Sequence, residues 1–261
     1  MSDGATIHPG AQVDPGAVLG ARTTIGPFSV IGPEVTLGPD CVVGPHVVIG
    51  GPAVLGARNR FYPFACVGMD PQDLKYAGER TSLEIGDDNS FREGVTVHRG
   101  TAGGGGVTRI GSHNLLMAQT HVAHDCQVGS HVIFANAATL AGHVTVEDGA
   151  TIGAFSGVHQ FCRVGAHAYI GGYSVLTQDA LPYVLTVGNR ARSFGVNVIG
   201  LERKKFSLEA IQALKQAYRI LFRSRLTQQE ALGRLDRELA GQPDVARLIA
   251  FIRQSTRGVI R

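Results

Sequence analysis

The chain has 261 residues, of which 44% are hydrophobic and only 17% are charged, a composition that excludes an intrinsically disordered protein. It contains 35 glycines, no tryptophan and 7% aromatic residues, so a core built around large rings is not expected. The net charge of +3 is unevenly distributed, because residues 202–261 hold 13 Lys and Arg against 6 Asp and Glu, or +7, and residues 1–201 sum to −4. A basic C-terminal segment predicts an acidic partner.

The first residues and the cysteines predict the compartment. Met1 to Gly4 carry no basic segment followed by an apolar one, and no stretch reaches the roughly 18 consecutive apolar residues of a spanning helix. We therefore expect a cytoplasmic protein without stable membrane insertion. The four cysteines form no CxxC pair, which argues against a structural zinc site, and reduced thiols in the core are the simplest interpretation.

A six-residue period dominates the sequence. Large apolar residues recur at every sixth position from Ile7 to Val67, return at Ile85, and continue after a shift from Ile110 to Leu176. Small residues occupy the position two places earlier in most hexads. Neither a helical period nor simple alternation produces this pattern. It predicts short strands that each contribute one large and one small inward side chain, with a corner after each strand.

Three such strands make a coil of about 18 residues, and coils stack at the ~4.8 Å spacing of strands. We therefore expect an all-β left-handed parallel β-helix of about ten coils over residues 1–190. Two interruptions, near 68–84 and 100–107, predict insertion loops on its surface, where repeat proteins often bind ligands. Four consecutive glycines at 103–106 favour a mobile loop in the second insertion.

Residues 191–261 are expected to form a linker and a small C-terminal α-helical domain. Ser207 is a candidate N-cap, and Thr227 with Glu230 has the spacing of a capping box. Pro243 suits the first position of a third helix. This domain is expected to cover the open end of the β-helix, which would otherwise present unpaired strand edges.

Of the ten histidines, His121, His124, His143 and His159 lie in one short region of the sequence. Because residues about 18 apart stack on neighbouring coils, His124 should lie beside Gly142 and Gln160, with Asp125 beside His143. A histidine next to a carboxylate is the arrangement of a general base. Histidines that only stabilise the structure, and a zinc site at a subunit junction, are the alternatives.

Several runs of the sequence resemble a known family: Asn114–Met117, His121–Cys126, Thr139–His143, Val158–Cys162, Gln72–Glu79, Phe194–Asn197 and Ser255–Gly258. They are similar to those of the UDP-N-acetylglucosamine O-acyltransferases, which catalyse the first committed step of lipid A synthesis in Gram-negative bacteria. The resemblance spans the whole chain. The hexad repeat alone is shared by many acyltransferases, so the loop and histidine motifs are the more specific part.

The resemblance implies a homotrimer with active sites in the clefts between adjacent subunits. It implies transfer of an R-3-hydroxyacyl group from acyl carrier protein to the 3-hydroxyl of UDP-N-acetylglucosamine. The donor is carried on the phosphopantetheine of the carrier protein, so no cofactor, no metal and no nucleic-acid partner is expected. A related sugar-nucleotide N-acyltransferase and a metal-dependent hydratase on the same scaffold are the alternatives.

The resemblance also implies roles for single residues. His124 would be the general base, Asp125 would orient it, and the backbone N–H of Gly142 would stabilise the oxyanion. The residues expected to bind substrate are Gln72, Asp73, Lys75, His121, His143, His159, Gln160, Asn197 and Arg203.

Three further expectations concern the acyl donor. Gly172 matches the position that limits acyl-chain length in the family, and a glycine there predicts a longer hydroxyacyl chain. The residues expected to dock the acidic carrier protein are Arg203, Lys204 and Lys205. This chain has Ile199 where the family pattern often has a glutamate, so no polar contact to the donor is expected there.

Overall fold

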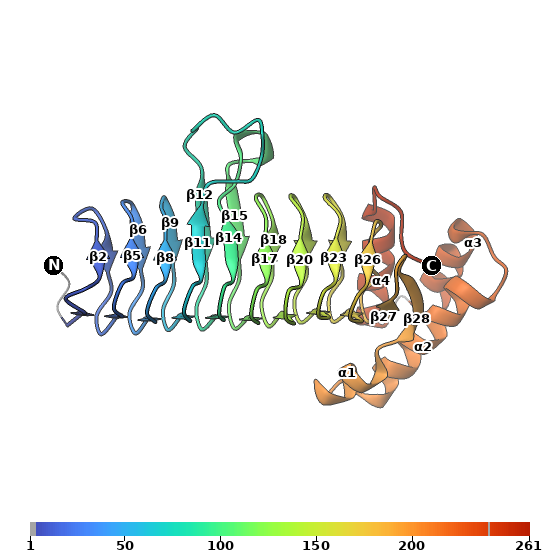
Figure 1. Ribbon diagram of the computed structural model, residues 1–261. Coiled ribbons are helices and arrows are strands. Elements are labelled where there is room, and N and C mark those ends of the chain that lie inside the picture. Colours follow the sequence, from blue (N-terminus) through green and yellow to red (C-terminus); the bar gives the residue numbers. More distant parts are fainter. Residues whose placement is uncertain (1–3, 240) are drawn as a thin grey trace.

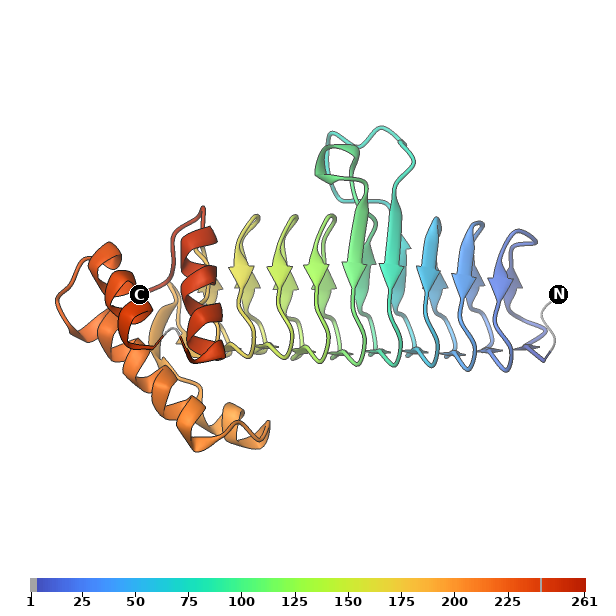
Figure 2. The same cartoon turned by 180° about the vertical axis from the view of Figure 1, so that it is seen from behind.

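The computed structural model describes residues 4–239 and 241–261. The chain forms a three-sided prism of short strands, with helices at one end and two loops projecting from the middle of one edge (Figure 1). The N-terminal part of the described chain lies at the end opposite the helices, as the view from behind also shows (Figure 2).

Each turn of the chain places one strand in each of three sheets. Sheet A contains β1 (Thr6–Ile7), β4 (Thr24–Ile25), β7 (Val42–Val43), β10 (Arg60–Phe61), β13 (Ser90–Phe91), β16 (Leu115–Leu116), β19 (Ile133–Phe134), β22 (Thr151–Ile152), β25 (Tyr169–Ile170), β27 (Val184–Val187) and β28 (Arg192–Val196). Sheet B contains β2 (Gln12–Val13), β5 (Val30–Ile31), β8 (Val48–Ile49), β11 (Cys66–Met69), β14 (Thr96–His98), β17 (His121–Val122), β20 (Thr139–Leu140), β23 (Gly157–Val158) and β26 (Val175–Leu176). Sheet C contains β3 (Val18–Leu19), β6 (Val35–Leu37), β9 (Ala53–Leu55), β12 (Ser82–Ile85), β15 (Val107–Ile110), β18 (Gln127–Val128), β21 (Thr145–Val146) and β24 (Arg163–Val164).

The strand pairing follows the hexad pattern even across the insertions. Phe61 of β10 pairs with Phe91 of β13 on the far side of the first insertion, and Phe91 pairs with Leu116 of β16 on the far side of the second. Leu116 then pairs with Phe134 of β19 without interruption. All of these pairs are parallel and join equivalent hexad positions. The predicted parallel β-helix is therefore confirmed.

The inward side chains form one continuous core. Phe134, one of the large apolar residues of the repeat, is 0% exposed. The small residues of the repeat bind the corner of the next coil: the Thr23 hydroxyl donates to the carbonyl of Gly38 (3.0 Å), and the Cys126 thiol donates to that of Ala141 (3.2 Å). These small residues of the repeat thus donate hydrogen bonds to backbone carbonyls that would otherwise be buried without a partner.

The cysteines occupy the places that the repeat predicts. All four are free thiols, and Cys41, Cys126 and Cys162 are buried. Burial raises the pKa of Cys126 to about 12, so this thiol is a packing residue and not a nucleophile. Ile7 differs from the pattern: it is 46% exposed, because β1 pairs with a neighbour on one side only.

Residues with φ of about +60° recur at each of the three corners of the prism, although not every coil contributes one. Corner AB, between sheets A and B, includes Phe28, His46, Phe64, Phe155 and Tyr173. Corner BC, between sheets B and C, includes Asp125, His143 and Phe161. Corner CA, between sheets C and A, includes Arg22, Asp40, Arg58, Asp88, His113, His131 and His167.

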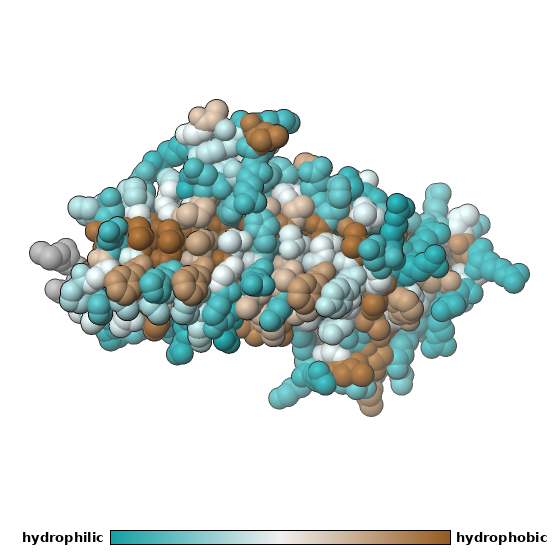
Figure 3. Space-filling model, viewed as in Figure 1, coloured by the Kyte–Doolittle hydropathy of each residue, from teal (hydrophilic) through white to brown (hydrophobic). Residues whose placement is uncertain are grey.

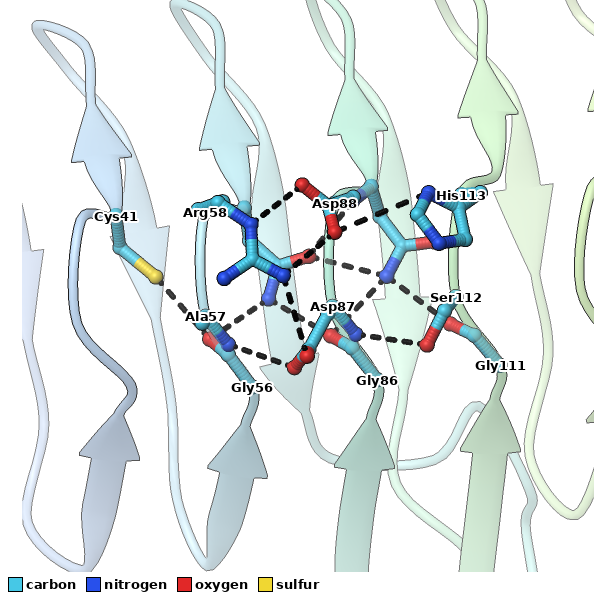
Figure 4. A network of polar contacts seen from close by, with 12 residues as sticks. Cys41, Gly56, Ala57, Arg58, Gly86, Asp87, Asp88, Gly111, Ser112 and His113 are labelled. Carbon is cyan, nitrogen blue, oxygen red and sulfur yellow. Dashed lines mark hydrogen bonds and ion pairs between the residues drawn. The ribbon is translucent and has the colours of Figure 1, made fainter.

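Corner CA is a ladder of charged side chains that links successive coils (Figure 4). Nε and Nη2 of Arg58 donate to the carboxylate of Asp88, at 2.8 and 2.7 Å. The neighbouring Asp87 accepts from the N–H of Ala57 (2.8 Å), and its own N–H donates to the hydroxyl of Ser112 (2.9 Å). Because water and salt screen exposed ion pairs of this kind, the ladder fixes the register of successive coils more than it stabilises the fold.

The helices are α1 (Val198–Arg203), α2 (Leu208–Arg223), α3 (Gln228–Glu238) and α4 (Pro243–Gln254). The expected start signals are confirmed: the hydroxyl of Ser207 accepts from the N–H of Ala210, Thr227 and Glu230 form a capping box, and Pro243 occupies the first turn of α4. Within the described residues, no helix has the length and apolar character to cross a membrane.

The helical part covers the C-terminal end of the prism, as expected. β28 pairs antiparallel with β27 and ends the parallel stacking of sheet A. Leu181, Tyr183 and Val184 pack in one buried cluster with apolar residues of the helices, and Ile260 joins the core of the prism. The division of the chain into residues 1–190 and 191–261 stays a prediction.

The packing predicts different costs for two adjacent substitutions in β6. Leu37 is 1% exposed in the core, whereas its neighbour Thr36 points outward. Leu37→Ala should lower the free energy of unfolding by about 2–5 kcal/mol. Thr36→Ala should change it by no more than about 0.5 kcal/mol. Urea unfolding followed by circular dichroism measures both free energies. Equal losses of stability in the two variants would contradict the placement of Leu37 in the core.

Candidate active site

Both insertions project from corner BC. Residues 70–81 connect β11 to β12, and residues 99–106 connect β14 to β15, so the two loops leave the prism side by side (Figure 1). β14 pairs with β17, which carries His121 and leads into His124. The insertions therefore lie directly next to the coil that carries the candidate base.

His124 and Asp125 form a hydrogen-bonded pair at this corner. Nδ1 of His124 lies 2.8 Å from Oδ2 of Asp125, and the side chains are 15% and 0% exposed. Because a carboxylate only accepts hydrogen bonds, Nδ1 carries the proton and Nε2 is left as the basic atom. The backbone N–H of Asp125 donates to the hydroxyl of Thr108 (2.8 Å), which holds the corner in its left-handed conformation.

The second insertion supplies further partners of the carboxylate. The N–H of Thr101 donates to Oδ1 of Asp125 (2.9 Å) and its hydroxyl donates to Oδ2 (2.7 Å). Thr101 was not recognised as a site residue from the sequence, because the insertion breaks the count of residues per coil. The glycine-rich loop that we expected to be mobile is thus packed against the candidate site.

Gly142 lies beside the imidazole of His124, as the stacking predicts. A Cβ atom at position 142 would come within 2.5 Å of Cε1 of His124, so a side chain cannot be accommodated without moving the ring. Among the described residues, the N–H of Gly142 donates no hydrogen bond. It is therefore a free donor next to the candidate base. Gln160 follows on the next coil and is exposed.

His143 completes the cluster at corner BC. Its Nε2 lies 3.8 Å from Oδ2 of Asp125, and its ring stacks on Phe161 at 4.4 Å and meets His124 edge-on at 5.1 Å. Burial lowers the pKa of His143, and the carboxylates of Asp125 and Asp73 partly oppose this effect. The carboxylate of Asp73 on the first insertion thus lies within electrostatic range of His143.

His121 and His98 form a second pair on sheet B. Nδ1 of His121 lies 2.7 Å from the hydroxyl of Thr96, and its ring meets that of His98 edge-on at 5.1 Å. Burial lowers the pKa of both histidines, to about 4 for His98. Both are therefore neutral near pH 7. His98 was missed from the sequence because it falls outside the run of motif histidines.

The first insertion is anchored at its base by Arg99, which is 8% exposed. Its guanidinium donates to the carbonyl of Gly68 (2.6 Å) and pairs with Asp70. Farther out on the loop, Gln72 and Lys75 are exposed, and Asp73 accepts from the N–H of Lys75 (3.0 Å). The loop thus has a fixed base and presents its polar side chains outward.

The structure divides the remaining predicted residues between the corners of one subunit. His159 lies at corner BC, exposed, with Nδ1 3.2 Å from a terminal nitrogen of Arg257 in the folded-back C-terminal segment. Gly172 lies at corner AB, where a Cβ would come within 3.3 Å of the carbonyl of Ala154.

Asn197 and the basic residues that follow it lie near corner CA. The side chain of Asn197 caps α1 and donates to the carbonyl of His167 (3.2 Å). Arg203 and Lys205 are exposed, whereas the ammonium of Lys204 donates to the carbonyl of Gly149. A single subunit therefore does not bring Asn197, Arg203 and Gly172 together with His124.

The cluster at corner BC also has the composition of a metal site. His124, Asp125 and His143 offer ligand atoms that all lie within 4.8 Å of one another. Hydrogen bonds from Thr101 and His124 already engage both carboxylate oxygens. This bonding favours acid–base chemistry over metal binding.

The fold and the histidine–carboxylate pair define a hexapeptide-repeat transferase. The profile of the bacterial transferase hexapeptide repeat matches residues 1–33 and 143–178, and that of domain 2 of UDP-N-acetylglucosamine O-acyltransferase matches residues 179–260. A relative from Myxococcus xanthus, named as an acyl-acyl carrier protein–UDP-N-acetylglucosamine O-acyltransferase, is 56% identical over 206 residues, which are 79% of this chain and 80% of the relative.

Solved structures agree over nearly the whole chain. LpxA from Acinetobacter baumannii is 45% identical with a TM-score of 0.95, covering 98% of this chain and 99% of the other. The UDP-N-acetylglucosamine acyltransferase of Francisella novicida is 37% identical with a TM-score of 0.96, covering 98% and 94%. This chain therefore belongs to the UDP-N-acetylglucosamine O-acyltransferase family, and the resemblance seen in the sequence is confirmed.

The buried histidines predict a loss of stability in mild acid. Burial lowers the pKa of His98 and of His167 from 6.5 to about 4. The unfolded chain therefore takes up protons below about pH 6.5 that the folded chain takes up only near pH 4. The free energy of unfolding should be at its full value above this window and fall as the pH decreases through it.

Urea unfolding at several pH values between about 7.5 and 4 measures this loss. His98→Asn should reduce the pH dependence, whereas the same change at the exposed His8 should leave it unaltered. If the free energy of unfolding depends on pH equally in the wild type and in His98→Asn, the loss of stability in acid does not come from His98.

Proposed function

We propose that this chain transfers an R-3-hydroxyacyl group from acyl carrier protein to the 3-hydroxyl of UDP-N-acetylglucosamine, the first step of lipid A biosynthesis. The names of the relatives support this activity. One observation carries the mechanism: the hydrogen-bonded pair of His124 and Asp125 lies next to the free N–H of Gly142, beneath both insertions.

In the proposed reaction, Nε2 of His124 takes the proton of the sugar hydroxyl as its oxygen attacks the thioester carbonyl. Asp125 stabilises the resulting imidazolium, and the N–H of Gly142 donates to the oxyanion of the tetrahedral intermediate. Collapse of the intermediate breaks the carbon–sulfur bond, and the imidazolium returns its proton to the phosphopantetheine thiolate. The thiol of the donor thus leaves protonated, and the enzyme returns to its starting state without a cofactor of its own.

The surroundings of this pair suit a nucleotide sugar. Lys75 on the exposed part of the first insertion suits the diphosphate, and Gln72 and Asp73 suit sugar hydroxyls. His121 and His143, whose pKa values are lowered by burial, are neutral and can accept hydrogen bonds from hydroxyl groups. His159 and Gln160 extend this polar lining along the next coil.

The distribution of the residues favours a homotrimer. Gly172 at corner AB and Asn197 and Arg203 near corner CA can act with His124 only if a neighbouring subunit brings its corner to corner BC. Exposed apolar side chains suit such contacts and are visible on sheet B and on the edge below it (Figure 3). Along corner AB the exposed aromatic residues are Phe28 (63% exposed), Phe64 (64%), Phe155 (55%) and Tyr173 (70%), and Leu74 (107%) is exposed on the first insertion.

The basic C-terminal part suits the acyl carrier protein. Arg203 and Lys205 are exposed at the end of α1, in a segment with a net charge of +7. Lys204 contributes less to docking in this proposal, because its ammonium is held by the carbonyl of Gly149. Both proposed substrates are water-soluble, which suits a cytoplasmic reaction.

Replacing the proposed base gives the main test. His124→Ala should lower kcat by about 10²- to 10⁴-fold, because the sugar hydroxyl loses its proton acceptor. The exposed His113 of corner CA provides the matched control, and His113→Ala should retain activity. Mass spectrometry of the product formed from UDP-N-acetylglucosamine and hydroxyacyl carrier protein measures the turnover.

Three outcomes would contradict the proposal. Near-normal turnover by His124→Ala would exclude this base. A product acylated on nitrogen would favour the related N-acyltransferase. Loss of activity in a chelator, restored by zinc, would favour metal chemistry at His124, Asp125 and His143.

The proposed acyl-chain ruler gives a second test. Gly172→Met should shift the preference towards shorter hydroxyacyl carrier proteins, because the methionine side chain would occupy space beyond the Cβ position that a glycine leaves to the acyl chain. The KM for UDP-N-acetylglucosamine should stay unchanged. Competition between donors of several lengths measures the preference, and an unaltered ratio of products would refute the ruler.

A further inference from the structure

The glycine-rich second insertion, residues 101–106, packs against the carboxylate of Asp125. The segment contains a single turn of 3-10 helix (Ala102–Gly104). The N–H groups of Gly104 and Gly106 both donate to the carbonyl of Thr101, at 3.0 and 2.8 Å. Thr101 is 5% exposed. The segment is thus folded around Thr101, which is the residue that contacts the carboxylate.

Thr101 binds both oxygens of the carboxylate. Its N–H donates to Oδ1 and its hydroxyl to Oδ2 of Asp125, the oxygen that also accepts from Nδ1 of His124. A carboxylate with one partner can rotate about its side-chain torsion, whereas donors on both oxygens fix its plane. Because Asp125 is fully buried, the same donors also satisfy lone pairs that water cannot reach.

Gly104 lies against the other side of the same group. A Cβ atom at position 104 would come within 2.0 Å of Cγ of Asp125 and within 2.3 Å of both carboxylate oxygens. No side chain fits there unless the carboxylate moves. Gly103, its neighbour in the same turn, is a natural contrast, because a Cβ at position 103 meets nothing within 4 Å.

We propose that residues 101–106 are a positioning segment that fixes the carboxylate of Asp125 against His124. Thr101 and Gly104 are positioning residues: they touch Asp125 and act on the reaction only through it. The segment inserts into the coil next to the one that carries His124 and Asp125, so it supports the pair from outside the prism. Its effect on turnover rests on the proposed function, whereas its effect on the geometry does not.

The test compares two alanine substitutions in the same turn. Gly104→Ala should lower kcat by about 10²-fold, because a displacement of about 1 Å at a catalytic group costs this much. Gly103→Ala should keep kcat near the wild-type value. Both variants should retain the KM for UDP-N-acetylglucosamine, since neither residue is proposed to contact it. Equal kcat values for the two variants would overturn the proposal.

Thr101 provides a second arm that separates positioning from folding. Thr101→Val removes the hydroxyl but keeps the shape, and should lower kcat, whereas Thr101→Ser keeps the hydroxyl and should restore most of the activity. In an Asp125→Asn background, Thr101→Val should cause little further loss, because residues that act as a unit are not additive. If the losses of kcat caused by Thr101→Val and Asp125→Asn add in full, Thr101 does not act through Asp125.

A structural arm keeps the proposal testable whatever the reaction is. A crystal structure of Gly104→Ala should show the carboxylate of Asp125 displaced from Nδ1 of His124, and that of Gly103→Ala should show it in place. An unmoved carboxylate in Gly104→Ala would overturn the proposal even if turnover changed. A wild-type protein that does not acylate UDP-N-acetylglucosamine would instead contradict the proposed function, and the crystallographic comparison would still decide the inference.

Discussion

The backbone hydrogen bonds between successive coils are the constraint on which the rest of the structure depends. They fix the register, so that residues one coil apart stack directly, as His124 and Gly142 do. This stacking turns a repeat in the sequence into three columns in space, one at each corner. A corner places its residue in the left-handed conformation and directs it out of the prism. Function can therefore occupy the corners without disturbing the core.

At the candidate site, the two insertions interrupt the repeat and bring additional residues to the stacked corner BC. The insertions leave sheet A undisturbed, since β10, β13 and β16 remain in register across both. In sheet B the register shifts only locally, between Val67 and Met69 of β11, so the insertions can carry Asp73 and Thr101 towards the histidines while the stack continues. Burial of Asp125 and the free N–H of Gly142 then provide an oriented carboxylate and an unused donor within one corner. The other corners carry Gly172 and Asn197, so the proposed site requires the proposed homotrimer.

The sequence predicted the elements whose signal is local and periodic. The hexads located the strands, and Ser207, Thr227 and Pro243 located three helix starts, because caps depend on a few adjacent residues. β28 was not predicted, because its antiparallel pairing with β27 has no counterpart in the repeat.

The contacts of the second insertion could also not be predicted from the sequence. A run of glycines shows that the backbone is free to turn, but it does not show that Gly104 lies against Asp125. The partners Thr101 and Asp125 are separated by a segment that does not follow the period, so counting residues cannot bring them together. Arg99 was missed for the same reason, since it follows the end of β14, where the chain leaves the repeat.

The two ends of the prism differ in their ability to join another copy. At the C-terminal end of sheet A, β28 runs against the direction of the stack and α2 packs on it, so another parallel strand cannot add to this sheet there. At the other end, within the part of the chain that the structure describes, β1 keeps one edge without a partner strand and Ile7 is exposed. In sheet A, a strand that pairs with the free edge of β1 would therefore be the β1 of another copy. Such a contact closes at two copies, so a molecule built from a repeat that could stack without limit is protected from growing into a fibre.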